Sequence, residues 1–226
     1  MKNVHQIYIS DNGHRPGEYV SSQMRKVKEL YHDYNYTLYD NEMCRTEIKS
    51  TFGEKAATLY DSLNSYSFKA DLARYCILYK YAGFYFDATL CPEFKLEFND
   101  CPVMYKAPHG SSKNVVPDFI DNGVMYFNQT GHSFLMDALS RSFKNIRSRN
   151  YGEHALDITG PCMLGRLYQY DICFGRSRWI NDGQKGAYFG ETLHWLYKPE
   201  GTTFNTFEGS GTNSYEKMWF DKKIFS

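Results

Sequence analysis

Two charged side chains on one predicted helix, and a third at the end of the next strand, are placed to act together. The stretch FKADLARYCILYKYAGFYFDATL, residues 68–90, has a helical pattern that stops at Gly83 and continues as an aromatic strand ending at Asp87. Asp71 and Arg74 are three residues apart and therefore neighbours on one helix face. Because open α/β sheets bind ligands at the carboxyl ends of their strands, the stretch predicts a polar ligand site.

The helical pair alone has a simpler interpretation. An Asp and an Arg three residues apart on a solvated helix are common, and they stabilise it by only about 0.2–0.5 kcal/mol. The strand that follows favours a site, because its β-forming residues end in an acid. The apolar side of the helix is formed by Phe68, Leu72, Tyr75, Cys76 and Tyr79.

Helices and strands alternate before this stretch. A buried-strand pattern at 4–10 ends in the turn signal DNGHRPG, and an amphipathic helix is predicted at 18–31. Residues 34–40 alternate like a strand. Asp40 or Asn41 can cap a helix beginning at Glu42, and a further helix is predicted at 54–64.

The alternation continues towards the C-terminus. Short strands are predicted at 101–108 and 122–128, then a helix from about Ser133 to Ile146 and another beginning at Pro161, and the tail from 186 mixes short strands with glycine-rich loops. No internal repeat, linker or low-complexity block interrupts this order. We therefore expect one α/β domain over residues 1–226.

Composition narrows the class of protein. The 226 residues are 42% hydrophobic and 23% charged, which is typical of a globular chain. Lysine plus arginine and aspartate plus glutamate balance at 26 each, so the charge does not favour nucleic acid or an anionic membrane as partner. No apolar run reaches the length of a membrane span, and the N-terminus lacks signal-peptide features. A cytoplasmic location is expected.

The cysteines show no pairing pattern. The six occur at positions 44, 76, 91, 101, 162 and 173, without a C-x-x-C or a regular spacing. Neither a zinc site nor a disulfide framework is favoured. We expect free thiols, several of them in the core.

The stretch KADLARYCILYKYAGFYFDAT resembles the segment that defines the DXD-type sugar transferases of GT-A fold. These include yeast initiating mannosyltransferases, bacterial capsular polysaccharide synthesis proteins and the glucosylating domains of large clostridial toxins. VHQIYIS and YNYTLYD are similar to the family's first two strands, NGVMYFNQTGHSFL to its later Asn-containing strand and helix, and DITGP to its T-G-P turn. The resemblance covers most of residues 4–165 and implies a Rossmann-like, nucleotide-sugar-binding domain with a mixed central sheet.

The resemblance also implies roles for individual residues. Tyr8 would stack on the nucleobase of a nucleotide-sugar donor. Asp71 and Arg74 would bind the donor sugar's hydroxyls and the phosphate side. Tyr85 would lie close to the diphosphate. Asp87 would be the first acid of the DXD element, contacting the ribose or donor sugar and helping to place a divalent metal.

Two asparagines and the T-G-P turn have alternative interpretations. The resemblance places Asn122 or Asn128 against the donor sugar, whereas Asn122-Gly123 could instead be a simple turn. Asp157 and Thr159 could face the acceptor, although helix capping is the favoured local role.

The DXD element itself is altered, because its second acid is replaced in Asp87-Ala88-Thr89. The resemblance implies Mn²⁺ or Mg²⁺, held by Asp87, by Thr89 directly or through water, and by His194. A hydroxyl is a poorer ligand than a carboxylate for such hard cations. Capsular-synthesis members look similar in having D-A-T here. Arg74, His194, Lys217 or backbone N–H groups of GSGTNS could share the diphosphate charge, although His194 is more simply a strand residue and the GSGTNS loop a turn.

The resemblance therefore implies a glycosyltransferase that moves a sugar, with retention, from a UDP- or GDP-sugar to a capsular, lipopolysaccharide or other surface glycan. The expected partners are this donor and acceptor, not nucleic acid, with peripheral contact to membrane-borne acceptors. A non-catalytic sugar-nucleotide-binding protein is the alternative, because the second acid is missing. A glycoside hydrolase needs two acids about 5–10 Å apart, and the sequence suggests no such pair.

Overall fold

The expected alternation of helices and strands is present. The structure is a computed structural model that describes residues 2–10, 13–98, 101–107, 119–167, 171–181, 184–189, 192–197 and 214–226, without side chains for 177–186 and 188–197. The strands are β1 (Asn3–Ile7), β2 (Asn35–Tyr39), β3 (Gly83–Phe86), β4 (Val103–Ala107), β5 (Phe119–Phe127), β6 (Cys173–Asn181), β7 (Gln184–Phe189) and β8 (Thr192–Tyr197). The helices are α1 (Glu18–Leu30), α2 (Asn41–Phe52), α3 (Glu54–Asp61), α4 (Tyr66–Tyr81), α5 (Ser133–Arg147), the 3₁₀ turn η2 (Ala155–Asp157), α6 (Pro161–Gly165) and α7 (Tyr215–Phe220).

All eight strands belong to one mixed sheet in the order β2-β1-β3-β5-β4-β6-β7-β8. Strands β2, β1 and β3 are parallel, and β5 lies antiparallel between β3 and β4. Strand β6 runs parallel to β4, and β6, β7 and β8 form an antiparallel meander. The parallel strands place the carboxyl ends of β1 and β3 at one edge, where ligands of open α/β sheets bind.

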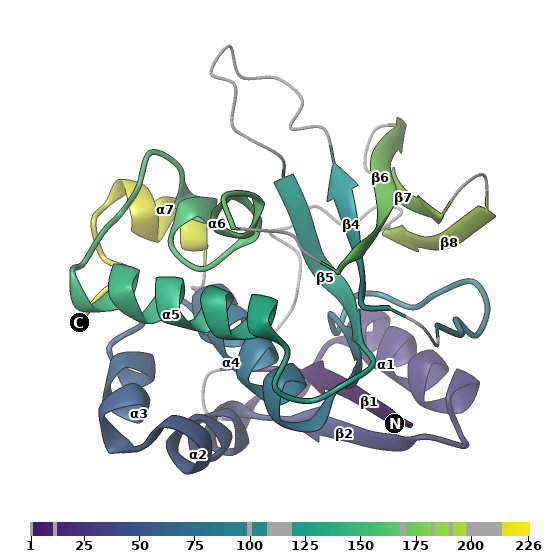
Figure 1. The fold of residues 1–226 in the computed structure, drawn as a ribbon, viewed down its shortest axis with the longest axis horizontal. Coiled ribbons are helices and arrows are strands. Elements are labelled where there is room, and N and C mark those ends of the chain that lie inside the picture. The colour runs from purple at the N-terminus through teal and green to yellow at the C-terminus, as the bar shows by residue number, and fades with distance from the viewer. Residues whose placement is uncertain are drawn as a thin grey trace.

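Apolar residues cover both faces of the sheet. Alternation in β3 directs Phe84 and Phe86 towards α1, where they share a buried cluster with Val27 and Tyr31. Tyr85, between them, belongs to the larger cluster around α2, α3, α4 and α5 on the other face. Helices α2 to α5 gather on one side of the sheet and α1 lies away from them, beside β1 and β2 (Figure 1).

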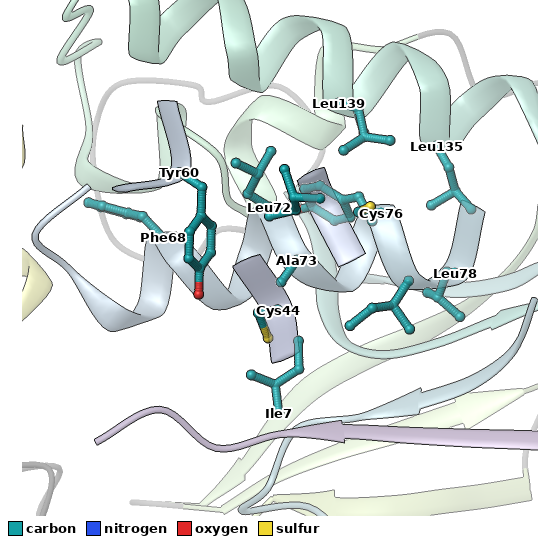
Figure 2. Close-up of a cluster of buried hydrophobic side chains, with 14 of the residues drawn as sticks. Ile7, Cys44, Tyr60, Phe68, Leu72, Ala73, Cys76, Leu78, Leu135 and Leu139 are labelled. Atoms are coloured by element: carbon teal, nitrogen blue, oxygen red, sulfur yellow. The ribbon is translucent and has the colours of Figure 1, made fainter. Parts of the chain in front are cut away.

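Helix α4 is buried on nearly all sides, because it packs between the sheet and other helices. Its residues Leu72 and Cys76 lie towards Leu135 and Leu139 of α5, while Ile7 of β1 approaches from the opposite side (Figure 2). This packing fixes the helix that carries Asp71 and Arg74.

A tight connection joins α4 to β3. Ala82 and Gly83 have φ angles of 54° and 98°, and a Cβ at Gly83 would collide with the carbonyl oxygen of Asn3. Asn3 and His5 of β1 bind the carbonyl oxygens of Tyr81 and Ala82 at 2.8 and 2.9 Å. Glycine is therefore required where the helix stops, because it tolerates this φ and has no Cβ.

The boundaries confirm much of the sequence prediction. Asp40 caps α2, with its Oδ1 accepting from the Met43 N–H at 2.8 Å. Strand β1 ends at Ile7 rather than at residue 10. Strand β5 begins at Phe119, so Asn122-Gly123 lies inside a strand and the alternative of a simple turn is wrong. The sequence pattern did not predict β6 or α7.

The prediction that all six cysteines are free thiols is wrong for one pair. Cys101 and Cys173 form a disulfide across 72 residues of sequence. They precede β4 and begin β6, and the parallel pairing of these strands brings them together. No spacing rule reveals such a long-range pair. Cys44, Cys76, Cys91 and Cys162 are free, and all but Cys91 are buried.

Across the described residues, no helix has both the length and the apolar character needed to cross a membrane.

Candidate functional site

Arg74 stands at the centre of a buried polar cluster. Its Nη1 lies 3.0 Å from Asp87 Oδ1 and donates to the Asn122 carbonyl at 2.7 Å, while Nη2 lies 3.2 Å from Asp71 Oδ1. Burial alone would lower the pKa of Arg74, but Asp87, Tyr85 and Asp71 raise it above its ordinary value. The guanidinium therefore stays charged and joins α4, β3 and β5.

Asp71 is held from three sides. Besides Arg74, its carboxylate accepts from Asn122 Nδ2 at 2.8 Å and from Thr159 Oγ1 at 2.9 Å. Burial raises the pKa of Asp71, and these three partners oppose that change. Only 9% of the Asp71 side chain and 6% of Arg74 is exposed, so the interpretation as a solvated surface pair is wrong.

Asp87 is the charged group of this cluster that reaches the surface. Its Oδ1 accepts from the Tyr85 hydroxyl at 2.8 Å, and the Arg74 guanidinium lies 4.6 Å from the centre of the Tyr85 ring. The Asp87 side chain is 37% exposed. Loss of surrounding water raises the pKa of Asp87, with Arg74 and Tyr85 opposing the change. Of the three charged groups, Asp87 is the best placed to touch a ligand.

The Asp87-Ala88-Thr89 triplet forms a turn at the end of β3. The Leu90 N–H donates to the Asp87 carbonyl at 2.8 Å, which closes the turn, and Thr89 is half-buried within it. Tyr8, just beyond β1, packs on a small apolar cluster that includes Ala88. The predicted nucleobase-stacking residue and the DXD position therefore lie at the same sheet edge.

Strand β5 completes the cluster through an irregularity next to β4. Val103 pairs with Tyr126 but Tyr105 pairs with Asp121, so β5 holds more residues than β4 over this stretch. Such bulges re-aim side chains and are frequent beside active sites. Here the Asn122 Nδ2 turns to α4 and donates to Asp71 and to the Tyr75 hydroxyl, at 2.8 and 2.9 Å.

Two predicted site residues are not brought to this cluster. Asn128 follows the far end of β5, where Phe127 pairs with Gly83, so it lies roughly 15 Å along the strand from Asp87. His194 belongs to β8, the edge strand, which β5, β4, β6 and β7 separate from β3. The His194 side chain is outside the described part of the structure.

The structure also shows where several other residues lie to which the sequence assigned a possible role at the site. Lys217 of α7 is exposed and pairs with Asp221 at 2.8 Å. Of the GSGTNS loop only Ser214 lies within the described residues, and it caps α7. Asp157 accepts from the backbone N–H groups of Glu153 and His154, at 3.0 Å each, and so completes the capping box of the 3₁₀ turn η2. Helix α6, which Asp157 or Thr159 was expected to cap, follows Gly160 without a side-chain cap, so the favoured interpretation is wrong.

Sequence reasoning missed Tyr75 and Asp121 and did not find the contact of Thr159 with Asp71. Tyr75 was assigned to the apolar side of its helix, yet its hydroxyl donates to the Thr159 carbonyl at 2.7 Å. Asp121 precedes Asn122-Gly123 in a D-N-G sequence that is typical of turns. An acid beside an expected donor-binding asparagine was the available signal.

The described residues include no group of three or more His, Cys, Asp or Glu side chains that could hold a metal ion. A divalent cation at this edge would need oxygen ligands from the donor or from water in addition to the protein. Mg²⁺ sites of that kind use one or two carboxylates together with substrate phosphates.

Comparisons with known proteins identify this segment. Residues 17–101 match a family described as the glycosyltransferase sugar-binding region containing a DXD motif. The match covers less than half of the chain, so it shows that this segment is similar to the sugar-binding region of such glycosyltransferases. The matched region holds α4, β3 and the Asp87 turn, so the family's sugar-binding region includes most of the cluster.

Curated proteins similar to this chain include two yeast enzymes. Inositol phosphoceramide mannosyltransferase 3 of Schizosaccharomyces pombe is 27% identical over 210 residues, covering 92% of this chain and 54% of the relative. A mannosyl phosphorylinositol ceramide synthase of Saccharomyces cerevisiae is 28% identical over 192 residues, covering 82% and 46%. The chain therefore spans about half the length of these relatives.

The chain also resembles a solved structure. PaToxG glycosyltransferase superposes with a TM-score of 0.52 at 14% identity, over 74% of this chain and 67% of that one. At this identity the likeness shows the fold. The expected GT-A-like fold with a mixed central sheet is confirmed.

Proposed function

We propose that this glycosyltransferase moves a sugar from a nucleotide-sugar donor to a glycan acceptor at the edge marked by Asp87. The observation that carries the proposal is the partly exposed Asp87 carboxylate, fixed by Arg74 and Tyr85 at the carboxyl end of β3. Tyr8 lies at the same edge and offers an aromatic face for the nucleobase.

In this proposal, two residues of the cluster position a third, and the third contacts the donor. The polar atoms of Asp71 and Arg74 are already engaged with one another and with β3, β5 and Thr159. They therefore act mainly by orienting Asp87, which faces the donor sugar or ribose. Orientation of this kind supports glycosyl transfer, because a small misplacement of reacting groups costs much of the rate.

The charge of the cluster favours help from a cation. Arg74 lies between the carboxylates of Asp71 and Asp87, and its charge is already shared by these two acids. The donor diphosphate would bring further negative charge to the same edge. A divalent cation, when bound, would neutralise the charge that develops on the departing nucleoside diphosphate. Asp87 would hold it, with Thr89 of the same turn contributing through its hydroxyl or through water.

The printed names of the two yeast relatives favour mannose as the transferred sugar. GDP-mannose is therefore the first donor to test, ahead of UDP-sugars. We further propose transfer with retention and an acceptor on a surface glycan or another membrane-borne molecule. These finer assignments rest on the relatives and on the sequence resemblance.

Thr89 supports one alternative. A chain that lacks the second acid of the DXD element could bind sugar nucleotides without turning them over. Both functions predict donor binding, but only the first predicts cleavage of the sugar–phosphate bond.

Thermal-shift measurements against UDP- and GDP-sugars, with and without Mn²⁺, test binding. A ligand at a hundred times its dissociation constant stabilises the folded state by about 2.7 kcal/mol. Release of nucleoside diphosphate from the same donors tests turnover. Turnover supports the transferase, stabilisation without turnover supports the binding protein, and inertness towards the whole panel contradicts both.

A further inference from the structure

Gly123 keeps open a small space between two carboxylates from different strands. A Cβ atom at this position would lie 3.1 Å from Asp87 Oδ2 and 3.2 Å from Asp121 Oδ1. The third neighbour would be the Leu90 side chain, at 3.0 Å. Both carboxylate oxygens therefore lie close to the position that a Cβ atom at Gly123 would occupy. The separation between the two oxygens cannot exceed the sum of these two distances.

The two oxygens of Asp87 face different surroundings. Oδ1 is occupied by Arg74 and by the Tyr85 hydroxyl, at 3.0 and 2.8 Å. Oδ2 is the oxygen beside Gly123. The positive charge of Arg74 therefore lies next to Oδ1 of Asp87. Oδ2 of Asp87 instead lies on the side of the second carboxylate, that of Asp121.

Asp121 is held in this position by its own strand. Its Oδ1 accepts from the Gly123 N–H at 3.0 Å, and the side chain is buried. Its negative charge is one of the influences that raise the pKa of Asp87. Two acids that approach from different strands repel each other unless a cation, a proton or water lies between them.

We propose that Asp121 supplies the second carboxylate of a divalent-cation site whose first carboxylate is Asp87, in place of the acid missing at Thr89. This proposal deepens the proposed function, on which it rests, because the cation would serve the donor diphosphate.

The donor set fits a cation such as Mg²⁺ or Mn²⁺. Metal–oxygen bonds of about 2.1 Å join oxygens that are roughly 3 Å apart when adjacent and roughly 4 Å apart when opposite. The proposed site requires side-chain rotations that bring the two acids to one of these separations across the space at Gly123. Waters and the donor diphosphate would complete the coordination shell, as is usual for Mg²⁺.

Binding of Mn²⁺ alone to the full chain, measured from the free-ion signal in electron paramagnetic resonance, tests the site without any donor. We expect Asp121→Asn and Asp87→Asn each to weaken Mn²⁺ binding at least tenfold. Gly123→Ala should weaken it similarly, because its methyl group fills the space while both acids remain. Asp137→Asn on the exposed face of α5 removes the same charge and should leave the affinity within twofold.

A purely structural role for Asp121 gives a different pattern. In the Asp121→Asn variant the amide oxygen can still accept from the Gly123 N–H, and the repulsion with Asp87 is removed. Melting temperatures in chelator and in Mn²⁺ therefore separate the two roles, because a protein that lacks a cation ligand should gain less stability from Mn²⁺ than the wild type does. A lower melting temperature with unchanged Mn²⁺ affinity would contradict the proposal, and so would a wild-type protein that binds no Mn²⁺ at millimolar concentrations. Mn²⁺ binding with the expected losses, but no donor turnover, would overturn the proposed function and leave the cation site standing.

Discussion

Arg74 and Asp87 form a 3.0 Å ion pair that joins the middle of α4 to the end of β3. Through this pair, helix α4 fixes the position of the partly exposed Asp87 side chain. Because Arg74 also binds Asp71 and the Asn122 carbonyl, a change at any of these three residues should alter the position of Asp87. The first two predictions test this connection.

Arg74→Lys should keep the charge but lose the fork that spans Asp71, Asp87 and the Asn122 carbonyl. An ammonium group cannot serve all three acceptors with the same geometry, and a buried acceptor left unpaired costs about 1–3 kcal/mol. We expect a loss of stability of that size in urea unfolding and a loss of donor turnover of at least tenfold. Wild-type values in both assays would show that the fork has no role.

Thr159→Val should disturb the site through Asp71. The substitution removes the hydroxyl that donates to Asp71 Oδ2 at 2.9 Å and keeps the shape of the side chain. We expect a loss of about 1–3 kcal/mol in unfolding free energy, together with reduced turnover. Thr159→Ser retains the hydroxyl and is the matched control. If valine and serine behave alike, the hydrogen bond does not position Asp71.

The periodicity of the sequence predicts the part of the site that lies within one continuous stretch. Asp71 and Arg74 follow from helical spacing, and Asp87 follows from the strand that ends in an acid. Their burial could not be predicted in the same way, because it depends on β5 and on Thr159, which are distant in sequence. The three-residue spacing is the same on an exposed helix and on a buried one.

Gly83→Ala should be severely destabilising. The φ of 98° is unfavourable for alanine, and the added methyl group would meet the backbone of Asn3 in the neighbouring strand. We expect a loss of about 2–4 kcal/mol or failure to fold, seen by circular dichroism and urea unfolding. Gly13→Ala is the control, because its φ is 69° and no atom lies within 4 Å of its added Cβ. Equal effects at the two positions would contradict the steric explanation.

His5 should make stability fall as the pH drops below about 6.5. Burial lowers the pKa of His5 from 6.5 to about 4, so the unfolded chain takes up a proton more readily than the folded one. The stability is therefore complete above pH 6.5 and is lost progressively towards pH 4. Between pH 7 and pH 5 we expect a loss of about 2 kcal/mol from this residue.

The measurement is urea unfolding of the wild type and of His5→Gln at both pH values. The His5→Gln variant should lose about 2 kcal/mol less than the wild type over this range. His14→Gln, at an exposed position, should retain the full wild-type dependence. Parallel pH profiles for wild type and His5→Gln would contradict the assignment.

The contribution of β5 shows what sequence patterns cannot supply. The dipeptide Asn122-Gly123 has the composition of a turn, yet pairing with β3 and β4 holds it in a strand. The irregular register between β4 and β5, which directs Asn122 towards α4, cannot be recognised from the local sequence. The Cys101–Cys173 disulfide was missed for the same reason, because strand order across the sheet brings the two residues together.

Donor cleavage by wild type and Asp87→Asn tests the central claim most directly. Asparagine can still accept from Tyr85 and Arg74 at Oδ1, so the fold should survive with a loss of no more than about 1–2 kcal/mol in unfolding free energy. With GDP-mannose and then the wider donor panel in Mn²⁺, we predict nucleoside diphosphate release by the wild type and a loss of at least a hundredfold in Asp87→Asn. Release by the folded variant at a rate near that of the wild type would contradict the account.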